Sequence, residues 1–329
     1  MKPFDEVERA TQRKWLKQLG QAALRQYGIE DAKLRLISES CYTVFRVDTG
    51  NQRYILRIDV ETPSDHWLVM QEAELLWLTA LRQDTALSVP EPITAQDGTW
   101  VQTVSTSRIP DGRIVTLLRW MPGHWIGNHP KPTVLAQMGT FMAHLHRHTE
   151  RFAFPEHVVT RPHTDWKKLR YWQDPQNDTS ATLTPEQRHL CTEASRRLLV
   201  EIEQVGTAAD YGLIHADMTP KNCLVHQGQL RVIDFADCRF ASHFYDIAVP
   251  LAYLNECQNY EALRAAFYEG YSRIRPLGRR YEAAVETFIV ARAFDVIEWM
   301  HLDWPSLTYF PYGPELLSRT IQRIRHYMQ

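Results

Sequence analysis

The stretch from residue 213 to residue 234 reads LIHADMTPKNCLVHQGQLRVID and carries the polar residues that decide the fold. Gln227 and Gly228 lie between two apolar runs, which is a typical signal for a β-hairpin turn. Folding two strands about this turn brings Asn222 and Asp234 to neighbouring feet of the hairpin, on the order of 5–8 Å apart. An amide oxygen and a carboxylate at that separation suit Mg²⁺.

Asp217 adds a further carboxylate beside the same end of the hairpin, on a loop that contains Thr219 and Pro220 and leads to Asn222. A lone aspartate in such a loop is most often a turn cap. The three polar residues together instead favour a site, in which Asp217 could receive the proton of a hydroxyl group.

Three motifs along this part of the chain resemble those of a known family. They are His-x-Asp-x-x-x-x-Asn at 215–222, Ile-Asp-Phe at 233–235 and Tyr-Asp-Ile-Ala at 245–248. They resemble the aminoglycoside phosphotransferase, choline kinase and homoserine kinase type II group, relatives of protein kinases, and the resemblance covers nearly the whole chain. It implies an α+β, bilobal, protein-kinase-like fold. A small antiparallel β-rich N-terminal lobe would occupy residues 1–121 and a larger, mostly α-helical C-terminal lobe residues 122–329.

The same resemblance implies a role for each motif residue. Asp217 would be the catalytic base, Asn222 and Asp234 would hold Mg²⁺, and Asp246 would brace the catalytic loop from the next helix. His215 would give that loop structural support. The chemistry agrees, because the phosphates of ATP repel an incoming oxygen, so their charge must be neutralised and the acceptor held in line.

Hydrophobic patterning changes at Met121-Pro122-Gly123. Before this boundary, residues 5–27 show the spacing of an amphipathic helix that would be a lid or a flank. Hairpins are predicted from strands at 42–47 and 53–58 and from strands at 100–104 and 114–118, with a buried helix over 66–82 between them. After the boundary the chain is mostly helical, with an apolar stripe over 134–145, a loop over 173–182 and a capping box at 184–187.

Arg57 is the candidate phosphate contact of the first lobe. Strand alternation places Ile55 and Arg57 on one face. The resemblance aligns Arg57 with the strand lysine of kinases, and a guanidinium fork can contact two phosphate oxygens. Ile55 would then form the floor of the adenine pocket. The alternative is an ordinary solvent-facing arginine on a strand.

The carboxylate partner of Arg57 should come from the helix over 66–82, which contains both Glu72 and Glu74. A buried unpaired carboxylate is costly, so pairing of one of them with Arg57 is expected. We favour Glu72, because the family pattern has its glutamate early in this helix.

The loop that covers the phosphates should span residues 38–43, where neither the glycine-rich motif nor the family's frequent asparagine is present. Backbone N–H groups and the Ser40 and Thr43 hydroxyls are the candidate contacts there. The backbone from Leu118 to Trp120 should read adenine as the hinge.

The acceptor should bind near the C-terminal helices, where acidic and aromatic residues suit an amine by charge pairing and cation–π contact. The alternative is an ordinary packed and solvated pair of helices. His124 and Trp125, after the boundary, are further candidates. The C-terminal candidates are Arg292, Asp295, Glu298, Trp299, His301, Asp303 and Trp304.

Composition excludes several other function classes. Lys plus Arg number 37 against 39 for Asp plus Glu, a net charge of −2, which argues against nucleic-acid or anionic-membrane partners. We find no signal-peptide core and no apolar run of ~18 residues. Five cysteines without C-x-x-C spacing fit a reducing, cytoplasmic compartment. A zinc site formed by His144, His146 and His148 is disfavoured, because helical residues two positions apart do not share one face.

The sequence therefore predicts an ATP- and Mg²⁺-dependent phosphotransferase. Its acceptor would be the hydroxyl of a small amine-containing molecule, such as a homoserine-like amino acid, an amino alcohol or an aminoglycoside. One alternative is a bacterial Ser/Thr protein kinase of the same fold. Another is a nucleotide-binding pseudokinase that acts as a regulator, against which the intact set of Asp217, Asn222 and Asp234 argues.

Overall fold

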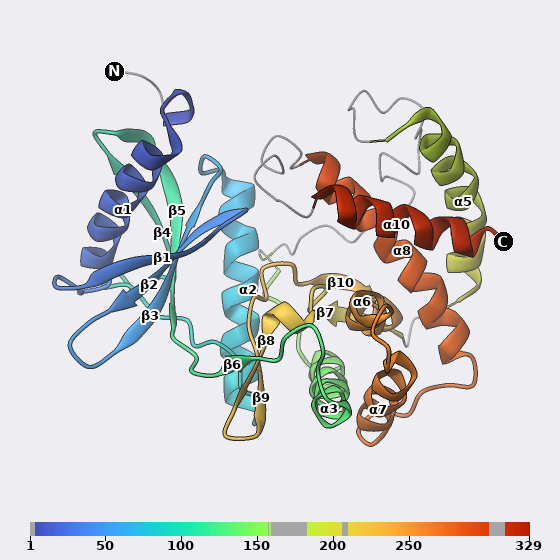
Figure 1. Ribbon diagram of the computed structural model, residues 1–329. Coiled ribbons are helices and arrows are strands. Elements are labelled where there is room, and N and C mark those ends of the chain that lie inside the picture. Colours follow the sequence, from blue (N-terminus) through green and yellow to red (C-terminus); the bar gives the residue numbers. More distant parts are fainter. Residues whose placement is uncertain (1–3, 157, 159–182, 206–209, 303–312) are drawn as a thin grey trace. The chain divides into compact units, whose positions relative to one another are not determined.

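The computed structural model describes residues 4–156, 158, 183–205, 210–302 and 313–329 (Figure 1). The chain forms two compact units. The first comprises Met1–Gly123, Phe152–Thr160 and Arg231–Ala236, and the second comprises His124–Arg151, Arg161–Leu230 and Asp237–Gln329. The loop predicted over 173–182 lies outside the described residues.

The first unit is built on a five-stranded antiparallel sheet of order β1-β2-β3-β5-β4 (Figure 1). Both predicted hairpins are present, and a further strand pairs at the edge. The bounds are β1 (Lys33–Glu39), β2 (Tyr42–Asp48), β3 (Arg53–Asp59), β4 (Val101–Thr106) and β5 (Ile109–Arg119).

One face of this sheet is covered by α1 (Arg9–Gln26), which follows a short 3-10 helix, η1 (Phe4–Glu6). The apolar stripe of α1, including Leu16 and Leu19, packs on inward-facing sheet residues such as Leu56. A Cβ on Gly20 would lie 2.9 Å from Leu56 Cδ2, so helix and sheet approach closely there. The amphipathic N-terminal helix is thus a flank of the sheet.

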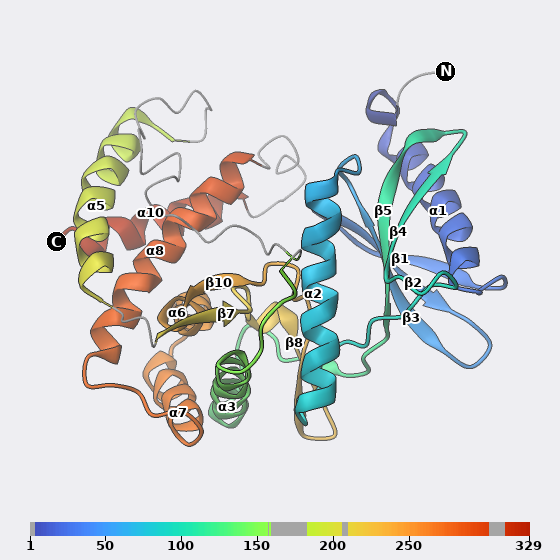
Figure 2. The same cartoon turned by 180° about the vertical axis from the view of Figure 1, so that it is seen from behind.

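The opposite face carries α2 (Asp65–Asp84), as Figure 2 shows from behind. The helix begins where the Ser64 hydroxyl accepts the Trp67 N–H, and its Trp77, Leu78 and Leu81 are fully buried. The Phe235 ring meets the Trp77 ring edge-on at 5.4 Å. This contact and a hydrogen bond from Val232 N to Ser88 O hold residues 231–236 to the first unit.

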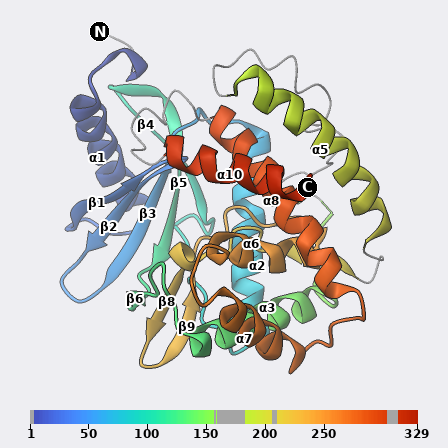
Figure 3. The same cartoon turned by 45° about the vertical axis from the view of Figure 1, so that its right-hand side comes forward.

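The second unit is mostly helical. Within it, α8 packs against α5, α6 and α10 (Figure 3). Its helices are α3 (Pro132–Thr149), α5 (Pro185–Gln204), α6 (His243–Leu254), α7 (Tyr260–Ser272), α8 (Tyr281–Leu302) and α10 (Gly313–Tyr327). The predicted capping box is present at the start of α5, where Thr184 and Gln187 bond reciprocally.

Five short strands flank the loop after residue 214 and form the hairpin around Gln227 and Gly228. They are β6 (His124–Trp125), β7 (Tyr211–Ile214), β8 (Cys223–His226), β9 (Gln229–Val232) and β10 (Arg239–Ser242). The predicted turn between β8 and β9 has positive φ at both Gln227 (52°) and Gly228 (77°), as a two-residue type I′ turn requires.

Helices α3 and α7 lie side by side in Figure 1 and touch at backbone level through glycines. We expect Gly270→Ala to destabilise the protein by about 2–3 kcal/mol, because its Cβ would lie 1.9 Å from the carbonyl oxygen of Ala136. Urea unfolding measures the loss. Gly278→Ala is the matched control, since a Cβ there meets no described atom within 4 Å. Equal stability of the two variants would contradict this packing.

Candidate active site

The loop after β7 is held in a strained conformation. Ala216 is fully buried and has φ 65°, a value that costs a residue with a Cβ roughly 1–2 kcal/mol. The Asp246 carboxylate, near the start of α6, accepts the N–H groups of His215 at 3.1 Å and Ala216 at 2.8 Å. These two hydrogen bonds stabilise the strained backbone.

Asp246 is held in turn by His146 of α3, whose Nε2 lies 3.0 Å from Asp246 Oδ2 and whose Nδ1 lies 2.8 Å from the Tyr271 hydroxyl. Burial by itself raises the pKa of Asp246, but the hydrogen bonds from His146 and from the Ala216 amide lower it overall. His146 is thus a structural residue of the brace. Among the described residues no group of three or more potential ligands forms a metal site.

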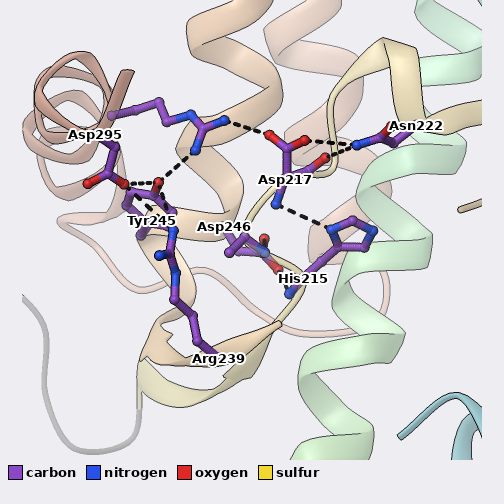
Figure 4. Close-up of polar contacts among 9 residues, drawn as sticks. His215, Asp217, Asn222, Arg239, Tyr245, Asp246 and Asp295 are labelled. Carbon is purple, nitrogen blue, oxygen red and sulfur yellow. Dashed lines mark hydrogen bonds and ion pairs between the residues drawn. The ribbon is translucent and has the colours of Figure 1, made fainter. Parts of the chain in front are cut away.

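Asp217 lies between two side-chain donors (Figure 4). The Asn222 amide nitrogen donates to Asp217 Oδ2 and to its backbone oxygen, both at 2.9 Å. Arg292 Nη2 donates to Asp217 Oδ1 at 2.5 Å. The backbone N–H of Asp217 donates to His215 Nδ1 at 3.2 Å. Both carboxylate oxygens are thereby oriented.

Arg292 belongs to a partly buried chain of polar groups. Its Nη1 donates to the Tyr245 hydroxyl at 3.0 Å, and that hydroxyl donates to Asp295 (Figure 4). Asp295 also lies 3.7 Å from Arg239 Nη2. Arg239 lies beside the start of the loop that follows β7, because β10 pairs with β7 in the register Arg239↔Ile214.

Burial raises the pKa of the Asp217 carboxyl, and the positive charge of Arg292 opposes that effect. The negative charge of Asp237 adds to the upward shift. The sequence argument did not single out Asp237 or Arg239, and it named Tyr245 only as part of the motif at 245–248. It assigned Arg292 to the acceptor site rather than to Asp217.

In the first unit, Arg57 forms a bidentate ion pair with Glu74, with Nη1–Oε1 at 2.9 Å and Nη2–Oε2 at 2.7 Å. The prediction that Glu72 is the partner of Arg57 is therefore wrong. Glu74 lies on one buried stripe of α2 with Gln71, Leu78 and Leu81, whereas Glu72 is only half-buried. A step of two residues turns the helix by about 200°, so the two glutamates point in different directions.

The Arg57 guanidinium is further fixed by two other side chains. Its Nε donates to the Thr116 hydroxyl at 3.2 Å. Its Cζ atom lies 5.1 Å from the centroid of the Tyr42 ring. Gln71 donates to the Tyr42 hydroxyl and so holds that ring in place. Burial would lower the pKa of Arg57, but the Glu74 carboxylate raises it. The guanidinium is thus charged, and these contacts use three of its five N–H donors.

Asp234 is exposed and has φ 64°. It belongs to the first unit, where its negative charge adds to the upward shift of the Arg57 pKa. Asn222 belongs to the second unit, so the predicted meeting of Asn222 and Asp234 stays a prediction. Ile55 is half-buried and alternates onto the Arg57 face of β3, as expected.

The expectation that the Thr43 hydroxyl contacts phosphate needs correction. Thr43 is 2% exposed and alternates with Phe45 and Val47 onto the face that α1 covers, so its hydroxyl does not share a face with Arg57. Ser40, by contrast, is exposed, and its N–H bonds to Tyr42 O.

The hinge backbone is also partly engaged. The N–H of Trp120 donates to Arg53 O at the end of the β3–β5 ladder. The N–H of Arg119 donates to Glu91 O, beside the isolated bridge between Pro92 and Leu118. Leu118 pairs with Ile55 in the same ladder. A backbone N–H that reads adenine would therefore come from residue 121 onward.

The expected acceptor residues are described only in part. Glu298 and Trp299 are half-buried on α8. The His301 side chain, Asp303 and Trp304 lie outside the described residues. His124 and Trp125 are exposed on β6, which pairs with β8.

The sequence pattern of the phosphotransferase enzyme family (APH) matches residues 33–283, which is more than half of the chain. Two curated relatives are kinases. Amicoumacin kinase of Bacillus subtilis (strain 168) is 23% identical over 71% of this chain and 66% of its own length, slightly less than two thirds. Homoserine kinase of Gluconobacter oxydans (strain 621H) is 26% identical over 77% of this chain and 79% of its own.

Solved structures of the same fold cover almost the whole chain. A microcompartment-associated aminopropanol kinase superposes with a TM-score of 0.76 at 27% identity and 94% coverage of both chains. The amicoumacin kinase hAmiN, in complex with AMP-PNP, Ca²⁺ and Ami, superposes with a TM-score of 0.73 at 19% identity, covering 96% of this chain and 93% of that one. Among the described residues, none of the helices combines the length and the apolar character that a membrane crossing requires.

Proposed function

Because the chain belongs to the APH phosphotransferase enzyme family, we propose that it transfers the terminal phosphate of ATP to a hydroxyl group of a small molecule. The observation that carries the proposal is the arrangement around Asp217. A carboxylate on a braced loop has both oxygens oriented by Asn222 and Arg292, as a positioned base requires.

We propose that Arg57 binds phosphate oxygens and that Asn222 and Asp234 hold the metal ion. The Asn222 amide nitrogen is turned toward Asp217, which directs the amide oxygen elsewhere, and the Asp234 carboxylate is exposed. Both are hard oxygen donors of the kind that Mg²⁺ prefers. When bound, Mg²⁺ neutralises phosphate charge.

In the reaction, the acceptor hydroxyl donates its hydrogen bond to Asp217 and is thereby oriented. The acceptor oxygen forms a bond to the γ-phosphorus as the bond from that phosphorus to the β–γ bridging oxygen breaks. The hydroxyl proton passes to Asp217, and ADP leaves with the bridging oxygen. Arg57, locked by Glu74, contributes fixed positive charge toward the phosphates.

The proposed acceptor class is a small amine-containing alcohol: an amino alcohol, a homoserine-like amino acid or an aminoglycoside. The names of the relatives support it, since they include an aminopropanol kinase and a homoserine kinase. Glu298 and Trp299 on α8 are the described residues whose chemistry suits an amine. We place the protein in the cytoplasm, which agrees with its five cysteines and their lack of C-x-x-C spacing.

The test is acceptor-dependent release of ADP by the wild-type chain with Mg-ATP and a panel of amino alcohols, hydroxy amino acids and aminoglycosides. We expect one group of related compounds to be phosphorylated, with one ADP formed per phosphate ester. Phosphate found on serine peptides instead would support the protein-kinase alternative. A Mg-ATP thermal shift without turnover on any acceptor or peptide would support the pseudokinase alternative.

A further inference from the structure

We propose that Arg292, from α8, is the positioning residue for the Asp217 carboxylate, and that Tyr245 is the group that holds Arg292 in place. This inference rests on the proposed function, because it concerns the base of that reaction. It extends the site to a residue of α8 that lies 75 positions after Asp217 in the sequence.

The first step concerns the freedom of the Asp217 side chain. Asn222 holds one carboxylate oxygen, but one hydrogen bond leaves the carboxylate free to turn about it. Arg292 holds the other oxygen at 2.5 Å. Two donors on opposite oxygens fix both the position and the plane of the carboxylate, and therefore fix where an acceptor hydroxyl can meet it.

The second step concerns what fixes Arg292 itself. Its Nη1 donates to Tyr245 at 3.0 Å, and Tyr245 donates to Asp295, which lies three residues after Arg292 on α8. Residues three apart share a helix face, so α8 presents the guanidinium and the carboxylate together. The pair is closed by Tyr245 of α6, whose neighbour Asp246 braces the loop backbone.

Consequently two neighbouring residues of α6 hold Asp217 in place, one through the loop backbone and one through the Asp217 side chain. Asp246 fixes the backbone of residues 215 and 216, and Tyr245 fixes the side chain of residue 217 through Arg292. The contact requires a guanidinium rather than a charge alone, since two different nitrogens bridge Tyr245 and Asp217. A lysine has one nitrogen and cannot span both partners from the same stem.

The experiment compares steady-state kinetics of Arg292→Ala, Arg292→Lys and Tyr245→Phe with the wild type. We expect kcat to fall about 100-fold in Arg292→Ala and about 10-fold or more in Arg292→Lys, because small misplacement of a reacting group costs on that order. The KM for ATP should stay within about threefold, since the proposed phosphate contact, Arg57, is held by Glu74 and Thr116.

A rescue measurement distinguishes positioning from a structural role. Guanidinium ion at low millimolar concentration should raise kcat of Arg292→Ala at least about fivefold, by refilling the space between Tyr245 and Asp217. The matched control is Arg323→Ala on α10, another arginine of the second unit, which donates to Ala252 O and Asn255. Its turnover should be near wild type and unchanged by guanidinium. Adding Tyr245→Phe to Arg292→Ala should cause no further loss of kcat, since the two residues act in one chain.

Wild-type kcat in Arg292→Lys, or a loss in Arg292→Ala that guanidinium does not reverse, would overturn the inference while leaving the proposed function intact. Thermal unfolding of each variant separates loss of fold from loss of turnover, and Arg292→Lys serves as the test if Arg292→Ala does not fold. Absence of turnover in the wild type with every acceptor would instead contradict the proposed function.

Discussion

Asp217→Asn should lower kcat by about 10²–10⁴-fold while ATP still binds with nearly unchanged affinity. The amide has the size of the carboxylate but cannot accept the hydroxyl proton. The hydrogen bonds to Arg57 and the brace at Asp246 do not involve this side chain, so both units should keep their folds. Acceptor-dependent ADP release gives kcat, and titration with a nucleotide analogue gives the affinity.

The control for this variant is Asp111→Asn, an exposed aspartate on β5. It makes the same chemical change away from the loop, and its turnover should match the wild type. If Asp217→Asn also turned over at the wild-type rate, Asp217 would not be the base. Loss of both turnover and thermal stability in Asp217→Asn would show that its carboxylate mainly holds the fold.

Glu74→Ala should reduce the free energy of unfolding by about 3–5 kcal/mol. Arg57 is 5% exposed and Glu74 2% exposed, so removing the carboxylate leaves a buried guanidinium without its partner. Urea unfolding followed by fluorescence measures the change. The KM for ATP should rise as well, because the proposed phosphate contact would lose the group that orients it.

Glu72→Ala is the matched control on the same helix, since Glu72 is only half-buried; it should change stability by less than about 0.5 kcal/mol. Replacing both members of the buried pair, as Arg57→Met with Glu74→Leu, should recover most of the lost stability. The reverse order, with Glu72→Ala the more damaging single variant, would contradict the pairing.

The predicted family and the α+β kinase-like fold are confirmed by the family match and by the solved structures. They were accessible from sequence because the signals are local. The His-x-Asp-x-x-x-x-Asn motif occupies only residues 215–222. The residue types of the Gln227-Gly228 pair are enough to predict a two-residue hairpin turn. Strand alternation likewise placed Ile55 and Arg57 on one face without any knowledge of the sheet.

The errors arose where the outcome depends on tertiary packing. Helix α2 is apolar around much of its circumference, so its pattern did not say whether Glu72 or Glu74 faces the sheet. The sequence likewise did not say how far β5 stays paired, and that decides which hinge amides are engaged. Arg292 contacts Asp217 because of how α8 packs within the second unit, and no local sequence pattern predicts that packing.

The most direct test of the account is transfer of radiolabel from the terminal phosphate of ATP. The wild-type chain and Asp217→Asn would each be incubated with Mg-ATP and an amine-containing alcohol identified in the acceptor panel. The account predicts label in a phosphate ester of the small molecule with the wild type, and at least about 100-fold less with Asp217→Asn. Equal labelling by the two proteins, or label recovered only as inorganic phosphate, would contradict it.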